Sequence, residues 1–207
     1  MNTEMLKVFN KEKEQMGVAS RDVVHAKGLW HETFHCWFLS QEANQYYIHF
    51  QLRSKKKKDY PNMLDISAAG HINANERVCD GIREVHEELG VNVTYSDLIS
   101  LGTIPDEIIQ DNFIDRELGH VFLYIIPNIR DIIYNFEVEE VSGVFKIRLE
   151  EFERLWFKET KSVLTKGIVL DKELRHVEEE RLVSKGDFLP HANDYISKVI
   201  KALKNKL

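Results

Sequence analysis

Three glutamates, Glu84, Glu87 and Glu88, are the side chains in this sequence that are best placed to do chemistry. On a helix over residues 83–90, their i, i+3 and i+4 spacing puts the three carboxylates within about one turn of each other. Carboxylates this close repel one another unless a cation lies between them. Mg²⁺ prefers oxygen ligands of this kind and usually shares them with substrate phosphates. The alternative interpretation is a solvated acidic face, which is common on surface helices.

The residues around these glutamates predict a packed helix that follows a loop. An apolar stripe recurs at helical spacing on the other side of the predicted helix: Val78, Ile82, Val85 and Leu89. A loop with its own acid, from Gly70 to Glu76, precedes the helix, and Gly90 is a stop signal at its end. These surroundings favour a metal site over a solvated acidic face.

The stretch from Gly70 to Val91 resembles the Nudix box, G-x5-E-x7-R-E-U-x-E-E-x-G-U, in which U is aliphatic. The positions that match by type are Gly70, Glu76, Arg83, Glu84, Val85, Glu87, Glu88, Gly90 and Val91. The sequence departs from the pattern in two places. Six residues, rather than seven, separate Glu76 from Arg83, and Asn75 stands where a glycine is common.

The resemblance implies a Mg²⁺ site in the box, with Mn²⁺ as an alternative ion. Its ligands would be the carbonyl oxygen of Gly70 and the carboxylates of Glu84, Glu87 and Glu88. Arg83 is expected to hold a box glutamate in place rather than to contact substrate. Because the loop is one residue short, we expect Glu76 to be structural, bonded to loop amides, and not a metal ligand.

The resemblance extends to the isopentenyl diphosphate isomerase-like branch of Nudix proteins, over about Leu6 to about Phe152. The segments that carry it are residues 28–31, 52–54, 61, 67–71 and 139–141. In isomerases of this branch, histidines matching His31 and His71 help to bind metal, as do two late glutamates spaced two residues apart. Glu140 matches the second glutamate, but Val138 stands at the first, so only Glu140 is carried over, with Glu139 as an alternative.

Two features favour hydrolysis over isomerisation. Isomerases of this branch keep a reactive cysteine just before the Gly-His pair, together with a degraded acidic box. Here Ala69 stands at the cysteine position, and the box glutamates are intact. We therefore expect Mg²⁺-dependent hydrolysis of a pyrophosphate linkage, in a nucleoside diphosphate joined to another group or in a related diphosphate. An isomerase-like activity and a non-catalytic sensor of a pyrophosphate ligand are the alternatives.

The other expected site residues are a general base and cations that hold substrate phosphates. The base stays open among four carboxylates: Glu84, Glu117, Glu139 and Glu140. The run from Arg53 to Asp59 is strongly cationic, and most of its lysines are expected to be solvated. Arg53, whose planar fork binds phosphate oxygens in pairs, and Lys57 are the candidates for contacting phosphate, together with His71.

Composition fits a soluble globular protein of 207 residues with 43% apolar and 30% charged residues. The net charge of −6 gives no reason to expect binding to a nucleic-acid polymer. Two cysteines cannot make a disulfide framework, and neither a signal peptide nor an apolar run of about 20 residues is seen. A cytoplasmic protein that acts on a small diphosphate away from membranes is expected, with a homodimer as one alternative for its oligomeric state.

The pattern of apolar residues predicts the elements that position these side chains. Strands are expected at residues 6–10, 21–26, 30–39, 45–52, 64–68, 93–101, 118–126 and 141–147. Besides the box helix, helices are expected at residues 149–158, 170–183 and 190–207, and an irregular substrate-side loop at 105–116. The expected fold class is α/β (α+β): a Nudix-type α/β/α sandwich with a mixed sheet between helices. Residues 1–160 would form the hydrolase domain, and residues 161–207 a C-terminal helical extension packed on it.

Overall fold

Strand β3 (Trp30–Glu42) runs through the centre of the computed structural model, which describes residues 4–110, 113–129 and 132–207. With β4 (Gln45–Arg53) it forms the predicted hairpin, paired antiparallel from Phe38–His49 to Glu42–Gln45. Along its other edge, β3 pairs in parallel with β8 (Phe113–Ile125). The sheet is therefore mixed, as predicted.

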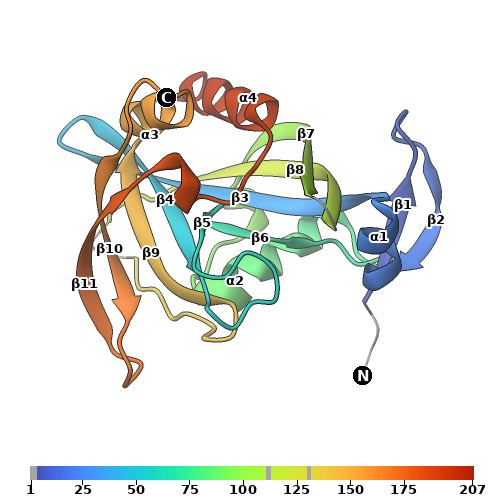
Figure 1. Cartoon of the computed structure of the whole chain (residues 1–207), viewed down its shortest axis with the longest axis horizontal. Coiled ribbons are helices and arrows are strands. Elements are labelled where there is room, and N and C mark those ends of the chain that lie inside the picture. The colour runs from blue at the N-terminus through green and yellow to red at the C-terminus, as the bar shows by residue number, and fades with distance from the viewer. Residues whose placement is uncertain (1–3, 111–112, 130–131) are drawn as a thin grey trace.

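The named strands form one sheet with the main order β11-β10-β9-β4-β3-β1-β2 (Figure 1). Strand β5 pairs with β4, β6 with β3, and β7 with β8. The remaining strands are β1 (Met5–Phe9), β2 (Gln15–Ser20), β5 (Leu64–Asp65), β6 (Ala68–His71), β7 (Ile99–Gln110), β9 (Val141–Arg148), β10 (Val163–Leu170) and β11 (His176–Val183).

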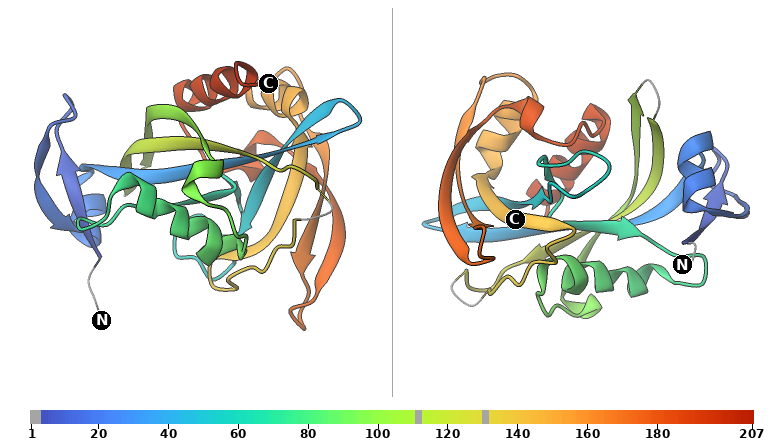
Figure 2. Two further views of the ribbon diagram at one scale, coloured as in Figure 1. Left: turned by 180° about the vertical axis from the view of Figure 1, so that it is seen from behind. Right: turned by 60° about the horizontal axis from the view of Figure 1, so that its bottom comes forward.

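Helices cover both faces of this sheet (Figures 1 and 2). The helix α2 (Arg83–Leu89) lies on one face, and α3 (Leu149–Trp156) and α4 (Asn193–Lys204) lie on the other. Strand β3 alternates between the two cores, because successive side chains of a strand point to opposite faces. Phe34 and Phe38 pack in the core with α2, whereas Trp37 packs in the core with α3 and α4. The architecture is the predicted sandwich.

The two C-terminal helices bury the faces that their sequence periodicity predicts. In α3 these residues are Phe152, Leu155 and Trp156, and in α4 they are Tyr195, Val199 and Leu203. No helix in the described residues is long and apolar enough to cross a membrane.

Residues 21–26 form a helix, α1 (Arg21–Lys27), so the prediction of an extended segment is wrong. Two adjacent valines favour a strand by propensity. The segment is nevertheless helical, because Gly28 at its end adopts a left-handed conformation with φ of 58° and can terminate a helix. Its N–H group bonds to the carbonyl oxygen of His25 and closes the helix.

Residues 105–110 belong to β7 and residues 113–116 to β8, so the predicted irregular loop over 105–116 is also wrong; residues 111–112 lie outside the described residues. The two strands pair antiparallel from Ile99–Leu123 to Gln110–Phe113. Pro105 fits because β7 pairs with β8 along only one edge. The polar residues resemble a loop in sequence because one face of this hairpin lines a polar cleft.

Residues 176–183 form β11, so the predicted helix over residues 170–183 is wrong. Asp171 makes the turn before it by accepting hydrogen bonds from the N–H groups of Glu173 and Arg175. The charges suit an edge strand, where they discourage pairing with other chains. The C-terminal segment thus supplies two strands as well as α4, and the domain boundary at residue 160 stays a prediction.

Two predicted strands have different bounds in the structure. The strand predicted over residues 64–68 is split into β5 and β6, with the Ser67 hydroxyl between them bonded to Phe38 N and His49 O. The strand predicted over residues 93–101 begins only at Ile99, because residues 95–97 form a 3₁₀ turn.

Candidate active site

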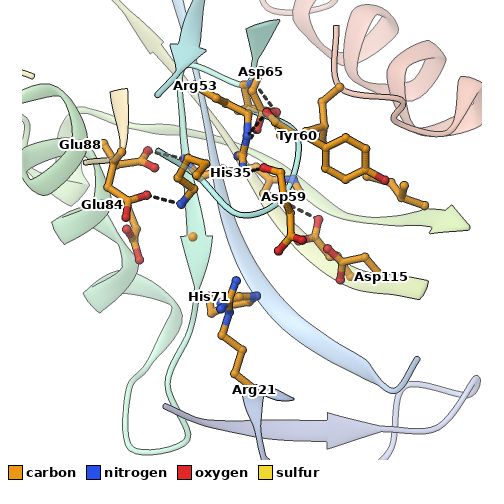
Figure 3. Close-up of a pocket in the computed structure, with 18 of the residues that line it drawn as sticks. Arg21, His35, Arg53, Asp59, Tyr60, Asp65, His71, Glu84, Glu88 and Asp115 are labelled. Carbon is orange, nitrogen blue, oxygen red and sulfur yellow. Dashed lines mark hydrogen bonds and ion pairs between the residues drawn. The ribbon is translucent and has the colours of Figure 1, made fainter. Parts of the chain in front are cut away.

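A cleft of about 470 Å³ opens beside the box helix and brings together residues that are distant in sequence (Figure 3). Its walls come from β6, α2, β8, the cationic loop after β4 and the C-terminal segment before α4. The predicted site residues that line it are Arg53, Lys57, Gly70, His71, Glu84, Glu87, Glu88, Glu117 and Glu140.

Arg83 joins several parts of the box through hydrogen bonds. Its Nε donates to Glu76 Oε1 at 2.8 Å, and its Nη2 donates to the His71 carbonyl oxygen at 3.0 Å. Its Nη1 donates to Glu84 Oε1 at 2.6 Å and to Glu87 Oε2 at 3.0 Å. One guanidinium thus ties the loop to two glutamates of α2, the role expected of Arg83.

The carboxylate of Glu76 is bonded to a residue of its own loop. Its Oε2 accepts a hydrogen bond from Asn73 N at 2.8 Å, and its carboxylate also pairs with Arg83. These are the contacts of a structural residue, although the expectation that Glu76 does not bind metal stays a prediction.

Glu84 and Glu88 lie beside Gly70 and are the more buried of the three box glutamates. Burial raises the pKa of Glu84 to about 7 and that of Glu88 well above its usual range. Glu88 Oε2 accepts hydrogen bonds from Ala69 N at 3.0 Å and Gln51 Nε2 at 3.2 Å. Two desolvated carboxylates beside the Gly70 backbone make a donor set that fits a hard divalent cation. Glu87 is more exposed, with 57% of its side chain accessible.

A second donor cluster, which includes His71 of the box, joins side chains from α1, β3, β6 and β8 and was not predicted as a unit. The rings of His25, His31 and His71 lie 5.1–5.4 Å apart, centre to centre. Ligand atoms of these three histidines lie within 4.8 Å of one another, as do those of His31, Asp115 and Glu117. Imidazole and carboxylate groups together suit a transition metal or Mn²⁺.

The protonation states of the histidines in this cluster are also compatible with binding a cation. His31 Nδ1 lies 3.1 Å from the Leu29 carbonyl oxygen, which can only accept, so the lone pair of the neutral ring is on Nε2. Burial lowers the pKa of His31 and of His25 to about 4. Within the described residues, His31 Nε2 and Asp115 Oδ1 are buried, 3.6 Å apart, and make no hydrogen bond. Buried polar atoms of this kind are expected where an ion binds.

Two lysines of the cationic loop form ion pairs with glutamates of this chain. Lys57 pairs with Glu140, and both side chains line the cleft. Lys56 pairs with Glu139, whose side chain is 62% exposed and does not line the cleft. Of the four general-base candidates, Glu139 is therefore the one that the structure places away from the others.

Sequence reasoning missed Asp115 and His25 as members of this cluster, and the role of Glu140 stays a prediction. The structure places two acids spaced two residues apart, Asp115 and Glu117, beside His31, whereas Glu140 lies with Lys57. The alternation of Asp115 and Glu117 on one face of a strand was the available signal. The prediction of a loop over residues 105–116 conceals this signal.

Comparison with known proteins gives the following relatives. No family model matches the chain. An uncharacterized Nudix hydrolase of Clostridium acetobutylicum is 37% identical over 204 residues, which is 98% of both proteins. Nudix hydrolase 3 of Arabidopsis thaliana is 32% identical over 164 residues, covering 77% of this chain and 21% of that protein. The crystal structure of a Deinococcus radiodurans protein has a TM-score of 0.54 at 18% identity, covering 72% of this chain and 86% of that one.

Proposed function

Because the chain belongs to the Nudix hydrolase family, we propose that it hydrolyses the pyrophosphate linkage of a small-molecule diphosphate with Mg²⁺ held by the box. The observation that carries this proposal is the pair of desolvated carboxylates, Glu84 and Glu88, beside Gly70 in the cleft. The substrate class is a nucleoside diphosphate joined to another group, or a related diphosphate. The cytoplasmic location and the homodimer alternative stay predictions.

Some residues of the cleft would bind the ion, and others would bind the substrate. Gly70, Glu84, Glu87 and Glu88 would hold the ion, which when bound neutralises phosphate charge and acidifies a water molecule. Arg83 keeps Glu84 and Glu87 oriented toward that position. Arg53 and Lys57, on the loop side, would contact the phosphates. Hydrolysis of a phosphoanhydride mainly requires such positioning and charge neutralisation.

The general base is one of three carboxylates that line the cleft: Glu84, Glu117 and Glu140. Burial works against ionisation of Glu117, but the charge of His35 and its hydrogen bond lower the pKa of Glu117 below its usual value. An ionised carboxylate can accept a proton from water. Glu140 is paired with Lys57, so substrate phosphate would have to draw Lys57 away before Glu140 could act.

Hydrolysis is tested by incubating the protein with nucleotide sugars, dinucleotides, coenzyme A and isoprenoid diphosphates in ¹⁸O-labelled water. With Mg²⁺ present, at least one compound should release a phosphate product that carries ¹⁸O, and chelation with EDTA should abolish this release. Tight binding of a compound without turnover would instead support the sensor alternative. Absence of both labelled product and binding across the panel, with Mg²⁺ or Mn²⁺, would contradict the proposal.

One observation favours a second candidate function, an isopentenyl diphosphate isomerase-like activity. The cluster of His31, His71 and two acids spaced by two residues agrees with the metal-binding residues that the isomerase branch implies. Against it, isomerisation needs one group to protonate the alkene and another to remove a proton. Ala69, at the position of the branch's reactive cysteine, can do neither, and Cys36 is buried on β3.

Isopentenyl diphosphate should therefore stay unchanged when it is incubated with the protein and Mg²⁺ or Mn²⁺ in deuterated water. The expected result is no deuterium in the alkene and no dimethylallyl diphosphate by NMR. The matched variant is Ala69→Cys, which restores the thiol of the branch. Deuterium incorporation by the unmodified protein at an enzymic rate would refute the hydrolase assignment.

The affinity for Mg²⁺ should rise with pH. In the metal-free fold the pKa of Glu84 is about 7, so the side chain must lose a proton before it can bind a cation. From pH 6 to pH 8 the ionised fraction of such a group increases about tenfold, and affinity should increase at least as much. Calorimetric titrations in two buffers of different ionisation enthalpy should show proton release at pH 6. Equal affinities at pH 6 and pH 8 would exclude Glu84 as a ligand.

A further inference from the structure

A row of alternating charges runs from beneath the C-terminal helix to the wall of the cleft. His191, just before α4, places Nδ1 2.5 Å from Asp106 Oδ2 and Nε2 2.9 Å from Asp65 Oδ1. The other oxygen of Asp65 accepts a hydrogen bond from Arg53 Nη1 at 2.9 Å. Of these four side chains, those of His191, Asp65 and Asp106 are nearly inaccessible to solvent. His191, Asp65 and Arg53 all line the cleft (Figure 3 labels Asp65 and Arg53).

The hydrogen bonds and the neighbouring carboxylates favour one assignment of charge in this row. Toward two ionised carboxylates both ring nitrogens of His191 donate, and the ring is an imidazolium. Burial alone would lower the pKa of His191, but Asp106 and Asp65 together raise it to about 10. Asp106, His191, Asp65 and Arg53 then alternate in sign and sum to zero. A buried row of this kind tolerates the loss of one member poorly, because a neighbour is left uncompensated.

Hydrogen bonds from Arg53 connect this row of charges to the cationic loop. Its Nη2 donates to the Asp59 carbonyl oxygen at 2.9 Å, and its Nε donates to the Tyr60 carbonyl oxygen at 3.1 Å. The loop between β4 and β5 carries Lys57 on its cleft side. Arg53 has five N–H groups, and three of them make these bonds and the one to Asp65. The side chain of Arg53 is 17% exposed and lines the cleft, so its remaining donors can face a ligand there.

We propose that His191 is a positioning residue for diphosphate binding, which holds Arg53 and the Lys57 loop in place through Asp65. The proposal rests on the proposed function of the cleft, because it assigns Arg53 and Lys57 to the phosphates. The C-terminal segment is then part of the substrate site rather than an accessory to the fold. Its attachment supports this: Leu189 N donates to Leu64 O, and Ala192 N donates to Asp106 Oδ1.

The test uses the full chain with saturating Mg²⁺ and methylenediphosphonate, a diphosphate mimic that water cannot cleave. His191→Gln should raise the Kd of this ligand about tenfold, the effect of losing one well-placed charged hydrogen bond. The affinity for Mn²⁺, measured by electron paramagnetic resonance, should change less than twofold because the box is untouched. Trypsin should also cut faster at the exposed Lys55 and Lys58 of the loop.

Asn193→Ala is the matched control for general loosening of the C-terminal segment. Asn193 Oδ1 accepts hydrogen bonds from Trp156 Nε1 and Lys185 Nζ, away from the cleft. This variant should lower the melting temperature but leave the Kd and the tryptic cleavage rate as in the unmodified protein. If His191→Gln does not fold, the double variant His191→Gln/Asp106→Asn removes one charge of each sign and should show the same rise in Kd.

The possible results distinguish failure of the positioning role of His191 from failure of the proposed function. Unchanged Kd in a folded His191 variant, with the unmodified protein binding the ligand, would overturn the positioning role alone. An equal rise in Kd for Asn193→Ala would also overturn it, since loosening would then explain both. Failure of the unmodified protein to bind methylenediphosphonate with Mg²⁺ would overturn the proposed function and the positioning role together.

Discussion

Glu84→Gln is expected to lower kcat by about two to three orders of magnitude while leaving the protein folded. A bound metal contributes several kcal/mol of charge stabilisation in the transition state, and each 1.4 kcal/mol lost costs about tenfold in rate. Glu84 is the box carboxylate that combines burial, with 13% of its side chain exposed, with a contact to Gly70. Glutamine keeps the shape of the side chain but cannot replace an anionic ligand.

The same substitution should not destabilise the metal-free protein. The folded-state pKa of Glu84, about 7, lies above its unfolded value of 4.5. The folded state therefore favours the protonated form, and the stability associated with that proton is lost as pH rises from 4.5 through 7. Above pH 7, Glu84→Gln should melt at an equal or higher temperature in EDTA.

Steady-state kinetics and calorimetry of Glu84→Gln should be compared with Glu150→Gln, an exposed glutamate in the first turn of α3. The Glu150 variant should behave as the unmodified protein. A Glu84 variant with normal kcat at saturating Mg²⁺ would remove this residue from the site. A variant that loses activity only because it unfolds would leave no reason to assign the carboxylate to metal rather than to structure.

Gly70→Ala should lower kcat by about a hundredfold without unfolding the protein. A Cβ atom on Gly70 would lie 2.2 Å from both Cδ and Oε1 of Glu84, far inside contact distance. The atoms in the way are the far end of a flexible side chain, so Glu84 can turn aside at little cost to the fold. Its carboxylate then leaves its place beside Gly70, and a shift of about 1 Å in a catalytic group can cost about a hundredfold.

Gly186→Ala is the control for this substitution. Among the described residues, the Cβ of residue 186 would meet the Ser184 hydroxyl, at 3.7 Å, as its one non-adjacent neighbour within 4 Å, which is an ordinary contact. It should leave both kcat and Mg²⁺ affinity unchanged. Full activity in Gly70→Ala, with Mg²⁺ affinity intact, would show that the approach of Glu84 to Gly70 has no part in catalysis.

The parts of the fold that follow local rules could be predicted from the sequence. The spacing of Glu84, Glu87 and Glu88 on one face of α2 follows from helical geometry alone. The faces of α3 and α4 follow from the periodicity of their apolar residues, and the β3–β4 hairpin from two alternating runs joined by a turn. In each case the information lies within about 20 residues of sequence.

The second donor cluster could not be predicted, because it depends on contacts between distant segments. The parallel pairing of β3 with β8 sets Trp30 opposite Arg116 and His31 opposite Glu117. Nothing local to His31 indicates that register. The His191 row has the same character, since it joins three strand residues to the C-terminal segment. Its charges, read singly, resemble surface residues.

Strand β11 shows why polar strands were mistaken for other structures. Its sequence HVEEERLV carries four charged residues, which favour helices or solvent by composition. As an edge strand it needs only one partner, β10, and most of its residues are exposed or half-buried. The pattern of a buried strand is therefore absent from its sequence.

Whether the box carboxylates bind the metal is tested most directly by anomalous diffraction from crystals soaked in MnCl₂. The expected result is a manganese peak beside α2, with oxygens of Glu84 and Glu88 and the Gly70 carbonyl at a coordination distance of about 2.1 Å. A further peak among His25, His31, His71 and Asp115 is compatible with this result, because that cluster also fits a cation. A peak at the histidine cluster alone, or one in which Glu76 replaces Glu84 as a ligand, would contradict it.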